Sequence, residues 1–122
     1  MQKIHRHMFL KEVKETYPER ADDLNRQEGV FSREVAVFLE FVQRLIDSED
    51  CQKVEVLLNR VDRYYSTGDR ALNEFTRNGV CEDLRFEDTK VVNRSWALAY
   101  LSPALTRERE LWIERMGPWA RK

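Results

Sequence analysis

The feature that most restricts the fold is an apolar stripe between residues 31 and 46. Apolar side chains recur there every three to four residues, which is the spacing of one face of an α-helix. They are Phe31, Val35, Phe38, Leu39, Val42, Leu45 and Ile46. Val37 and Phe41 add a second apolar edge, and a helix that is apolar on more than one side packs on more than one side. This segment is therefore predicted to be the central helix of the fold.

Helical spacing also dominates the rest of the chain, where only four glycines and three prolines interrupt it. The expected helices span about residues 4–16, 19–26, 48–65, 69–84, 93–101 and 102–116. Ser48, Asp69 and Ser102 are the expected N-caps, because their side chains can accept a hydrogen bond from an unpaired helical N–H. The sequence thus predicts an all-α fold, a compact bundle of about six helices. The bundle is expected to be orthogonal or like a short helical repeat, and to form a single domain over residues 1–122.

Several positions carry a specific expectation about packing. Gly79 lies inside a helical pattern, so either the helix breaks there or another backbone packs closely against it. We favour a continuous helix. Val91 and Val92 are expected to anchor the following loop in the core. In the last helix, Arg109 stands among alternating charges and is expected to face solvent, whereas Met116 is expected to point inward.

Composition limits the classes of partner. The 122 residues include 21 Lys and Arg against 22 Asp and Glu, for a net charge of −1. A general polyanion binder has a basic excess, so nucleic acid is not favoured as a ligand. Residues 91–122 nevertheless carry six basic and three acidic side chains, or +3. No apolar run approaches the ~18 residues that span a membrane, and the N-terminal run is too short for a signal peptide. We expect a cytosolic protein without a membrane partner.

Residues that could support catalysis or bind metal are few. His5 and His7 are the only histidines, and no third ligand is indicated near them. Cys51 and Cys81 form no C-x-x-C motif and are expected to be reduced thiols. The chain has no glycine-rich phosphate loop. We therefore predict no catalytic residues, no metal, no cofactor and no small-molecule substrate, and a protein that is not an enzyme.

Acidic side chains gather in two places. One cluster flanks Leu84-Arg85-Phe86, and the other is a pair near residue 22. Such clusters can be a solvated surface, a recognition patch for a basic partner, or the carboxylates of a hydrolase. We expect a partner-binding surface with an aromatic anchor near its centre. Its predicted residues are Glu82, Asp83, Phe86, Glu87, Asp88, Asp22 and Asp23.

Several segments together carry a family resemblance. They are the amphipathic helix at 31–46, the joint at 67–69, the stretch 73–84, and Leu101-Ser102-Pro103 before Trp112. Over roughly residues 31–118, they resemble the small helical immunity proteins of bacterial contact-dependent growth inhibition and related polymorphic toxin systems. Those proteins commonly have a glycine where this chain has Ser102.

The resemblance implies a function as well as a fold. Such immunity proteins bind one cognate toxin, often a nuclease, and block its active site without being enzymes. The partner would then be a cognate protein toxin in the cytoplasm. Two other functions remain open on the residues: a nucleic-acid-binding helical module that uses the basic C-terminal segment, and a small carboxylate-dependent hydrolase.

Overall fold

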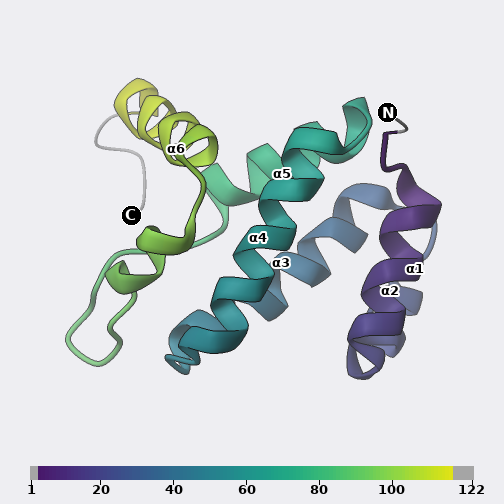
Figure 1. Ribbon diagram of the computed structural model, residues 1–122, viewed down its shortest axis with the longest axis horizontal. Coiled ribbons are helices and arrows are strands. Elements are labelled where there is room, and N and C mark those ends of the chain that lie inside the picture. Colours follow the sequence, from purple (N-terminus) through teal and green to yellow (C-terminus); the bar gives the residue numbers. More distant parts are fainter. Residues whose placement is uncertain (1–2, 117–122) are drawn as a thin grey trace.

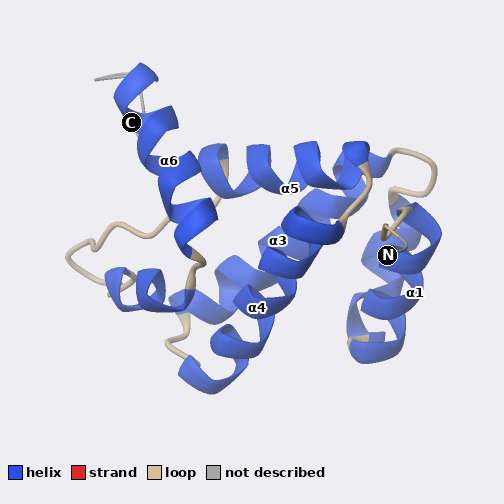
Figure 2. Ribbon diagram, turned by 45° about the horizontal axis from the view of Figure 1, so that its top comes forward, coloured by secondary structure: helices blue, strands red, loops and turns tan. Residues whose placement is uncertain are grey.

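The computed structural model describes residues 3–116, which form helices joined by loops (Figure 2). In chain order the elements are α1 (Arg6–Thr16), the 3₁₀ turn η1 (Pro18–Arg20), α2 (Ala21–Arg26), α3 (Phe31–Asp47), α4 (Cys51–Thr67), α5 (Arg70–Glu82), the 3₁₀ helix η2 (Ser95–Tyr100) and α6 (Pro103–Met116). Extended pairing in this part of the chain is limited to an isolated bridge between Ile4 and Gly68. The predicted all-α bundle is confirmed. Along the described residues, none of the helices is long and apolar enough to cross a membrane.

The helices α3, α4 and α5 form the middle of the molecule. The α1–α2 pair covers one side of them, and η2 and α6 cover the other (Figure 1). The stripe predicted for α3 is buried at Val35, Phe38, Leu39, Val42 and Ile46, and its second apolar edge also packs against the core. The prediction that this segment is the central helix is confirmed.

Close packing explains the glycine inside α5. A Cβ at residue 79 would lie 2.1 Å from Cδ1 of Leu39, a side chain that is buried in α3. The helix continues through Gly79 as expected. The close neighbour is a side chain of α3, however, and not the backbone of another element.

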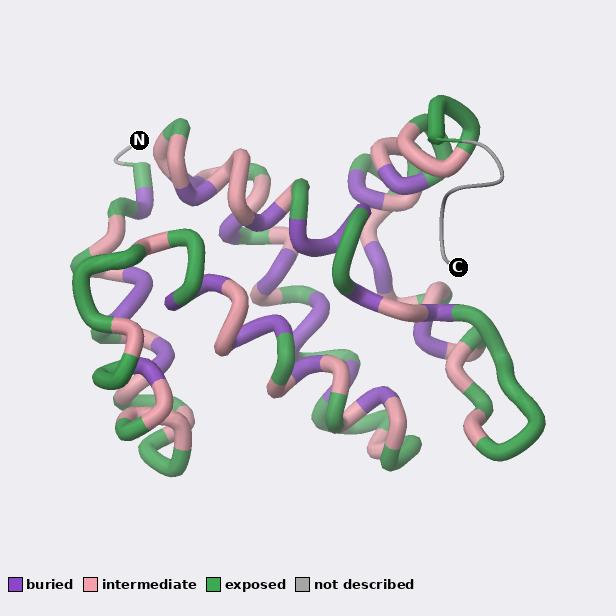
Figure 3. Tube along the Cα trace, turned by 180° about the vertical axis from the view of Figure 1, so that it is seen from behind, coloured by how far each residue is buried: buried purple, intermediate pink, exposed green. Residues whose placement is uncertain are grey.

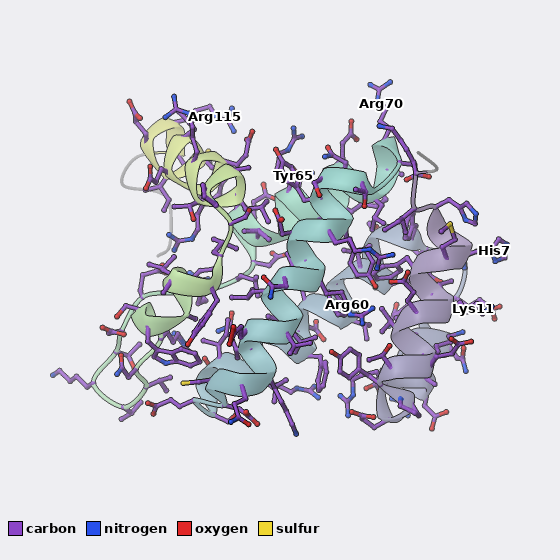
Figure 4. The ribbon with its side chains drawn as sticks, viewed as in Figure 1. His7, Lys11, Arg60, Tyr65, Arg70 and Arg115 are labelled. Atoms are coloured by element: carbon purple, nitrogen blue, oxygen red, sulfur yellow. The ribbon has the colours of Figure 1, made fainter. Side chains whose placement is uncertain are left out.

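Ion pairs fasten α1 to the centre. The Arg6 guanidinium donates two hydrogen bonds of 2.7 Å to the Glu34 carboxylate, which is 1% exposed and whose pKa these bonds lower. Burial alone would raise the pKa of Glu12, but hydrogen bonding to Arg63 helps to bring it below its ordinary value. Arg60 also reaches Glu12 and lies between α4 and α1 (Figure 4). Tertiary ion pairs therefore join α1 to α3 and to α4.

The start of α4 differs from the prediction. Ser48 does not cap it, because its hydroxyl donates to a carbonyl of α3 and Glu49 takes a left-handed φ of 57°. The cap is Asp50, whose side chain accepts a 3.3 Å hydrogen bond from a backbone N–H of the first turn. The caps expected at Asp69 and Ser102 accept hydrogen bonds from the third residue beyond them, and both are confirmed.

Burial also reverses three expectations near the C-terminus. Val91 is 90% exposed, so it does not anchor its loop, whereas Val92 is half-buried. Arg109 is 8% exposed and does not face solvent, whereas Met116 is 40% exposed and does not point inward. Leu105 is fully buried as predicted. Gly117 and Pro118, which are expected to close α6, lie outside the described residues. The loop takes its core contact from Phe86, which is 1% exposed.

Candidate functional site: a hollow between α3 and the end of α5

The predicted partner-binding residues do not form one surface. Glu82 and Asp83 are exposed and line a hollow, whereas the residues from Phe86 to Asp88 make contacts within the protein. Asp22 and Asp23 lie in the first turn of α2. The structure therefore divides the predicted set into residues that line a hollow and a structural part, from Phe86 to Asp88, that holds α6 and the loop.

The hollow lies between α3 and the chain that leaves α5, and its volume is about 340 Å³. The apolar side chains of Leu39 and Leu84 are almost completely buried beside it. Three exposed carboxylates and the guanidinium of Arg85 also contribute, so the charge of the lining is negative. The lining residues are Ala36, Leu39, Glu40, Gln43, Glu82, Asp83, Leu84 and Arg85.

Gln43 fixes the two walls of the hollow to each other. Its side-chain amide donates to the carbonyl of Arg85 at 3.1 Å, and its amide oxygen accepts from the N–H of Arg85 at 2.7 Å. The same amide donates to Asp47 at 3.0 Å. The glycine at residue 79 allows α5 to approach α3 one turn earlier. The positions of Glu82 and Asp83 relative to α3 are therefore set by the fold.

Glu87 and Phe86 belong to the structural part of the set. Glu87 pairs with Arg109 of α6, whose side chain is only 9% exposed. The Arg109 guanidinium carbon also lies 5.1 Å from the centre of the Phe86 ring. Because Phe86 is 1% exposed, it cannot be the aromatic anchor that we predicted for a partner. The sequence pattern misses this because α6 is distant in the chain.

Asp88 holds its own loop together. Its carboxylate accepts hydrogen bonds of 2.8 Å from the N–H of Arg94, the N–H of Ser95 and the hydroxyl of Ser95. These bonds lower the pKa of Asp88, with the backbone bond from Ser95 the largest cause. The residue ties the beginning of the loop to the start of η2.

On the other side of α3, Asp23 lines a smaller hollow of about 150 Å³. It forms ion pairs with Arg20 at 3.3 Å and with Arg26 at 3.0 Å, while Asp22 is exposed. Glu40 contributes to both hollows. Asp23 and the Glu82 pair thus lie on either side of Glu40, although the charge of Asp23 is balanced by its two arginine partners.

Sequence reasoning missed Glu40. It lies on the polar side of α3 between the two apolar edges of that helix, and it is exposed. The stripe analysis shows that it faces away from the main core, but not that the end of α5 lies beside it. The sequence gives one local indication that Glu40 belongs to the hollow: it lies three residues before Gln43, on the same face of the helix.

The chemistry of the hollow suits a cationic side chain. A Lys or Arg stem can lie on apolar surface while its charged head remains with carboxylates and water. Among residues 3–116, no group of three or more His, Cys, Asp or Glu side chains is arranged to hold a metal ion. The residues present therefore offer recognition of positive charge.

Comparison with known proteins gives a family. Residues 9–117 match the family described as "Domain of unknown function (DUF7674)". No curated protein matches the chain, and neither does any solved structure. Since the match extends over most of the 122 residues, the chain belongs to the DUF7674 domain family.

Proposed function

We propose that this protein binds a basic protein toxin and neutralises it by covering its active site, as immunity proteins do. The observation that carries the proposal is the hollow beside α3, which Glu40, Glu82 and Asp83 line. The resemblance of residues 31–118 to immunity proteins supplies the class of partner. The protein acts in the cytoplasm, by binding and without catalysis.

A nuclease is the class of toxin that best matches this surface. A nuclease cleft must attract phosphates, so Lys and Arg line it. Carboxylates that are held in fixed positions complement that potential and accelerate encounter. The stems of those basic side chains can lie against the half-buried Ala36 when their heads reach the carboxylates. Charge and shape therefore favour the same partner.

The contacts of the basic segment weaken the nucleic-acid alternative. Arg94 pairs with Asp47 at 2.7 Å, and Arg109 pairs with Glu87. Two of the positive charges that raised this alternative are thus balanced within the protein. The carboxylates around the hollow would also repel phosphates.

The hydrolase alternative loses half of its carboxylate cluster to structural contacts. Glu87 is the partner of a buried arginine, and Asp88 accepts three hydrogen bonds from its own loop. The pair Glu82 and Asp83 remains at the hollow, which supports binding better than acid–base chemistry that needs two cooperating groups.

Co-expression tests the proposal directly. The product of the gene immediately upstream is expressed in bacteria alone, with this protein, and with the variant E40Q/E82Q/D83N. We expect growth arrest with the upstream product alone, normal growth with the wild-type protein, and reduced protection with the variant. Co-elution of the two proteins from a sizing column should accompany protection.

A charge-matched variant controls for the change in net charge. E15Q/E55Q/E114Q also removes three negative charges, from exposed positions of α1, α4 and α6, and it should protect as the wild type does. If the upstream product does not arrest growth, or if the wild-type protein neither protects nor co-elutes with it, the proposed function is wrong.

A further inference from the structure

A third hollow lies between α5 and α6, two helices that pack against each other. Its volume is about 170 Å³, and it shares no lining residue with the acidic hollow beside α3. In Figure 3, α6 changes from buried and half-buried residues to exposed ones toward its C-terminal end, so the α5–α6 hollow is open to solvent there. Three lining residues come from each helix: Arg77, Asn78 and Cys81 from α5, and Glu108, Trp112 and Arg115 from α6.

Two guanidinium groups at this hollow have no carboxylate partner in the described chain. Within residues 3–116, neither Arg77 nor Arg115 forms an ion pair or a side-chain hydrogen bond. By contrast, Arg20 lines the hollow near α2 and is paired with Asp23 at 3.3 Å. Because Arg77 and Arg115 line one small hollow from two helices, their positive charges repel each other.

The carboxylate in the lining is held by another residue. Glu108 accepts a 3.4 Å hydrogen bond from the hydroxyl of Tyr65, and it is not within ion-pair distance of either arginine. Burial raises the pKa of Tyr65 and Arg77 acts against that rise, so the charge of Arg77 lies near the same hydroxyl. Figure 4 shows Tyr65 and Arg115 at the same edge of the molecule. The lining therefore has two guanidinium groups against one carboxylate, and an excess of positive charge.

We propose that the α5–α6 hollow binds a phosphate group between Arg77 and Arg115. Guanidinium groups donate paired hydrogen bonds to phosphate oxygens. A phosphate has at least three acceptor oxygens in different directions, which suits donors that reach it from two helices. A carboxylate has two oxygens in one plane and matches such donors less well. The bound phosphate also offsets the repulsion between the two arginines, and the exposed amide of Asn78 is a further donor at the rim.

The volume of the hollow limits the ligand to the phosphate itself. Sites that enclose a drug-sized ligand or a cofactor have about 300–1,000 Å³, and this hollow has about 170 Å³. The ligand is therefore free inorganic phosphate, or the terminal phosphate of a molecule whose other part remains in solvent. The site goes beyond the proposed function, since no toxin takes part in it.

Titration of the full chain, followed by NMR, tests the site. The probes are inorganic phosphate, AMP and adenosine, at an ionic strength that sodium chloride keeps constant. We expect saturable shifts of the Nε–H signals of Arg77 and Arg115 with inorganic phosphate or with AMP, and none with adenosine. Equal affinity for phosphate and AMP would identify free phosphate as sufficient, whereas tighter binding of AMP would identify a phosphate ester as the ligand.

Two double variants assign the binding to these arginines. R77Q/R115Q removes both charged donors and should weaken phosphate binding by about tenfold or more. R33Q/R107Q is the matched control, because it removes two exposed arginines of α3 and α6 that also form no ion pair within residues 3–116. Its Kd for phosphate should equal that of the wild type.

Thermal unfolding separates a binding role from a structural one. In phosphate-free buffer, R77Q/R115Q should melt at or above the wild-type temperature, because neither arginine has an ion pair to lose in the described chain. Added phosphate should raise the melting temperature of the wild type and of R33Q/R107Q, but not that of R77Q/R115Q. The proposal is overturned by the absence of saturable shifts, by equal phosphate affinity in the wild type and R77Q/R115Q, or by a lower melting temperature of that variant without phosphate.

Discussion

Two acidic pairs that look alike in the sequence have different places in the structure. Glu82-Asp83 and Glu87-Asp88 lie five residues apart, on either side of the same short segment. All four side chains are exposed, but the first pair lines a hollow between α3 and the chain that leaves α5. The second pair is bonded to α6, to the start of η2 and to its own loop. Position relative to a distant partner, and not residue type, determines which pair is available to another protein.

The two pairs should therefore differ in their effects on the stability of the fold and on the binding of a partner. Changing the first pair should cost the fold little, as is usual for exposed positions. The second pair balances a buried arginine and closes a loop. Substitutions in the first pair should change the free energy of unfolding little and the affinity for a partner strongly. Substitution of Glu87 should change the free energy of unfolding strongly and the affinity little.

The largest effect is expected at Phe86, the residue that separates the two pairs. Phe86→Ala should lower the free energy of unfolding by about 3–5 kcal/mol, because it leaves a cavity in the core. Urea denaturation measures the change. As the control, Val91→Ala in the same loop should change it by less than about 0.5 kcal/mol. An unchanged stability in Phe86→Ala would mean that the ring is not buried and that the division of the acidic set is misplaced.

A smaller loss is expected at Glu87. Glu87→Gln leaves Arg109 in the protein without its counter-charge, and breaking a buried ion pair costs about 3–5 kcal/mol. Because Glu87 itself is 44% exposed, we expect less than this, about 2 kcal/mol. Asp83→Asn is the control from the first pair, and its unfolding should stay close to the wild type. Equal losses in the two variants would remove the distinction between the pairs.

Acid should reduce the stability that paired carboxylates give to the fold. The pKa values of Glu12, Glu34, Asp47 and Asp88 are lowered in the folded protein, from ordinary values of 4.5 for Glu and 3.8 for Asp. A lowered folded pKa contributes stability that is complete above the ordinary pKa and is lost as pH falls through the folded value. The melting temperature should therefore be constant near neutral pH and should fall progressively below about pH 4.5.

The charge-neutral variant Glu34→Gln checks the origin of that fall. It removes one of the titrating groups and should flatten the acid limb of the stability curve, while lowering stability at neutral pH because Arg6 loses its partner. A melting temperature that does not change between pH 7 and pH 3 would show that these carboxylates do not stabilise the fold.

The smallest effect on stability is expected for the first pair. E82Q/D83N should change the free energy of unfolding by less than about 0.5 kcal/mol, as is usual for exposed positions. Its association rate with the toxin domain encoded upstream, inactivated at its own active site, should fall, and more strongly at low salt than at high salt, because the carboxylates steer encounter. A marked loss of stability in this variant would place Glu82 and Asp83 among the structural residues.

Local signals account for much of the fold. The stripe of α3 and the caps at Asp69 and Ser102 depend on neighbours within a few residues, and the structure confirms them. The prediction of Ser48 as a cap is wrong because another candidate, Asp50, stands two residues later. A cap is a choice among nearby side chains, and sequence reasoning could not rank these two.

Local sequence signals predict less of the candidate site than of the fold. Arg109 is buried against Glu87, which lies 22 residues earlier in the chain, so a pattern of alternating charge predicts the wrong side. Phe86 and Val91 exchange their expected places because the depth of a loop residue is set by the elements it meets. Glu82 and Asp83 were found by charge alone, while Glu40 requires knowledge that α5 ends beside α3.

The central claim is that the carboxylates around the hollow recognise a basic toxin. Its most direct test is the Kd for the inactivated upstream toxin domain at two salt concentrations, for the wild type, E40Q/E82Q/D83N and the charge-matched E15Q/E55Q/E114Q. We predict that the first variant loses at least about tenfold in affinity at low salt and shows a weaker salt dependence, while the matched variant retains both wild-type values. Wild-type affinity and salt dependence in E40Q/E82Q/D83N would contradict the account and place the interface elsewhere.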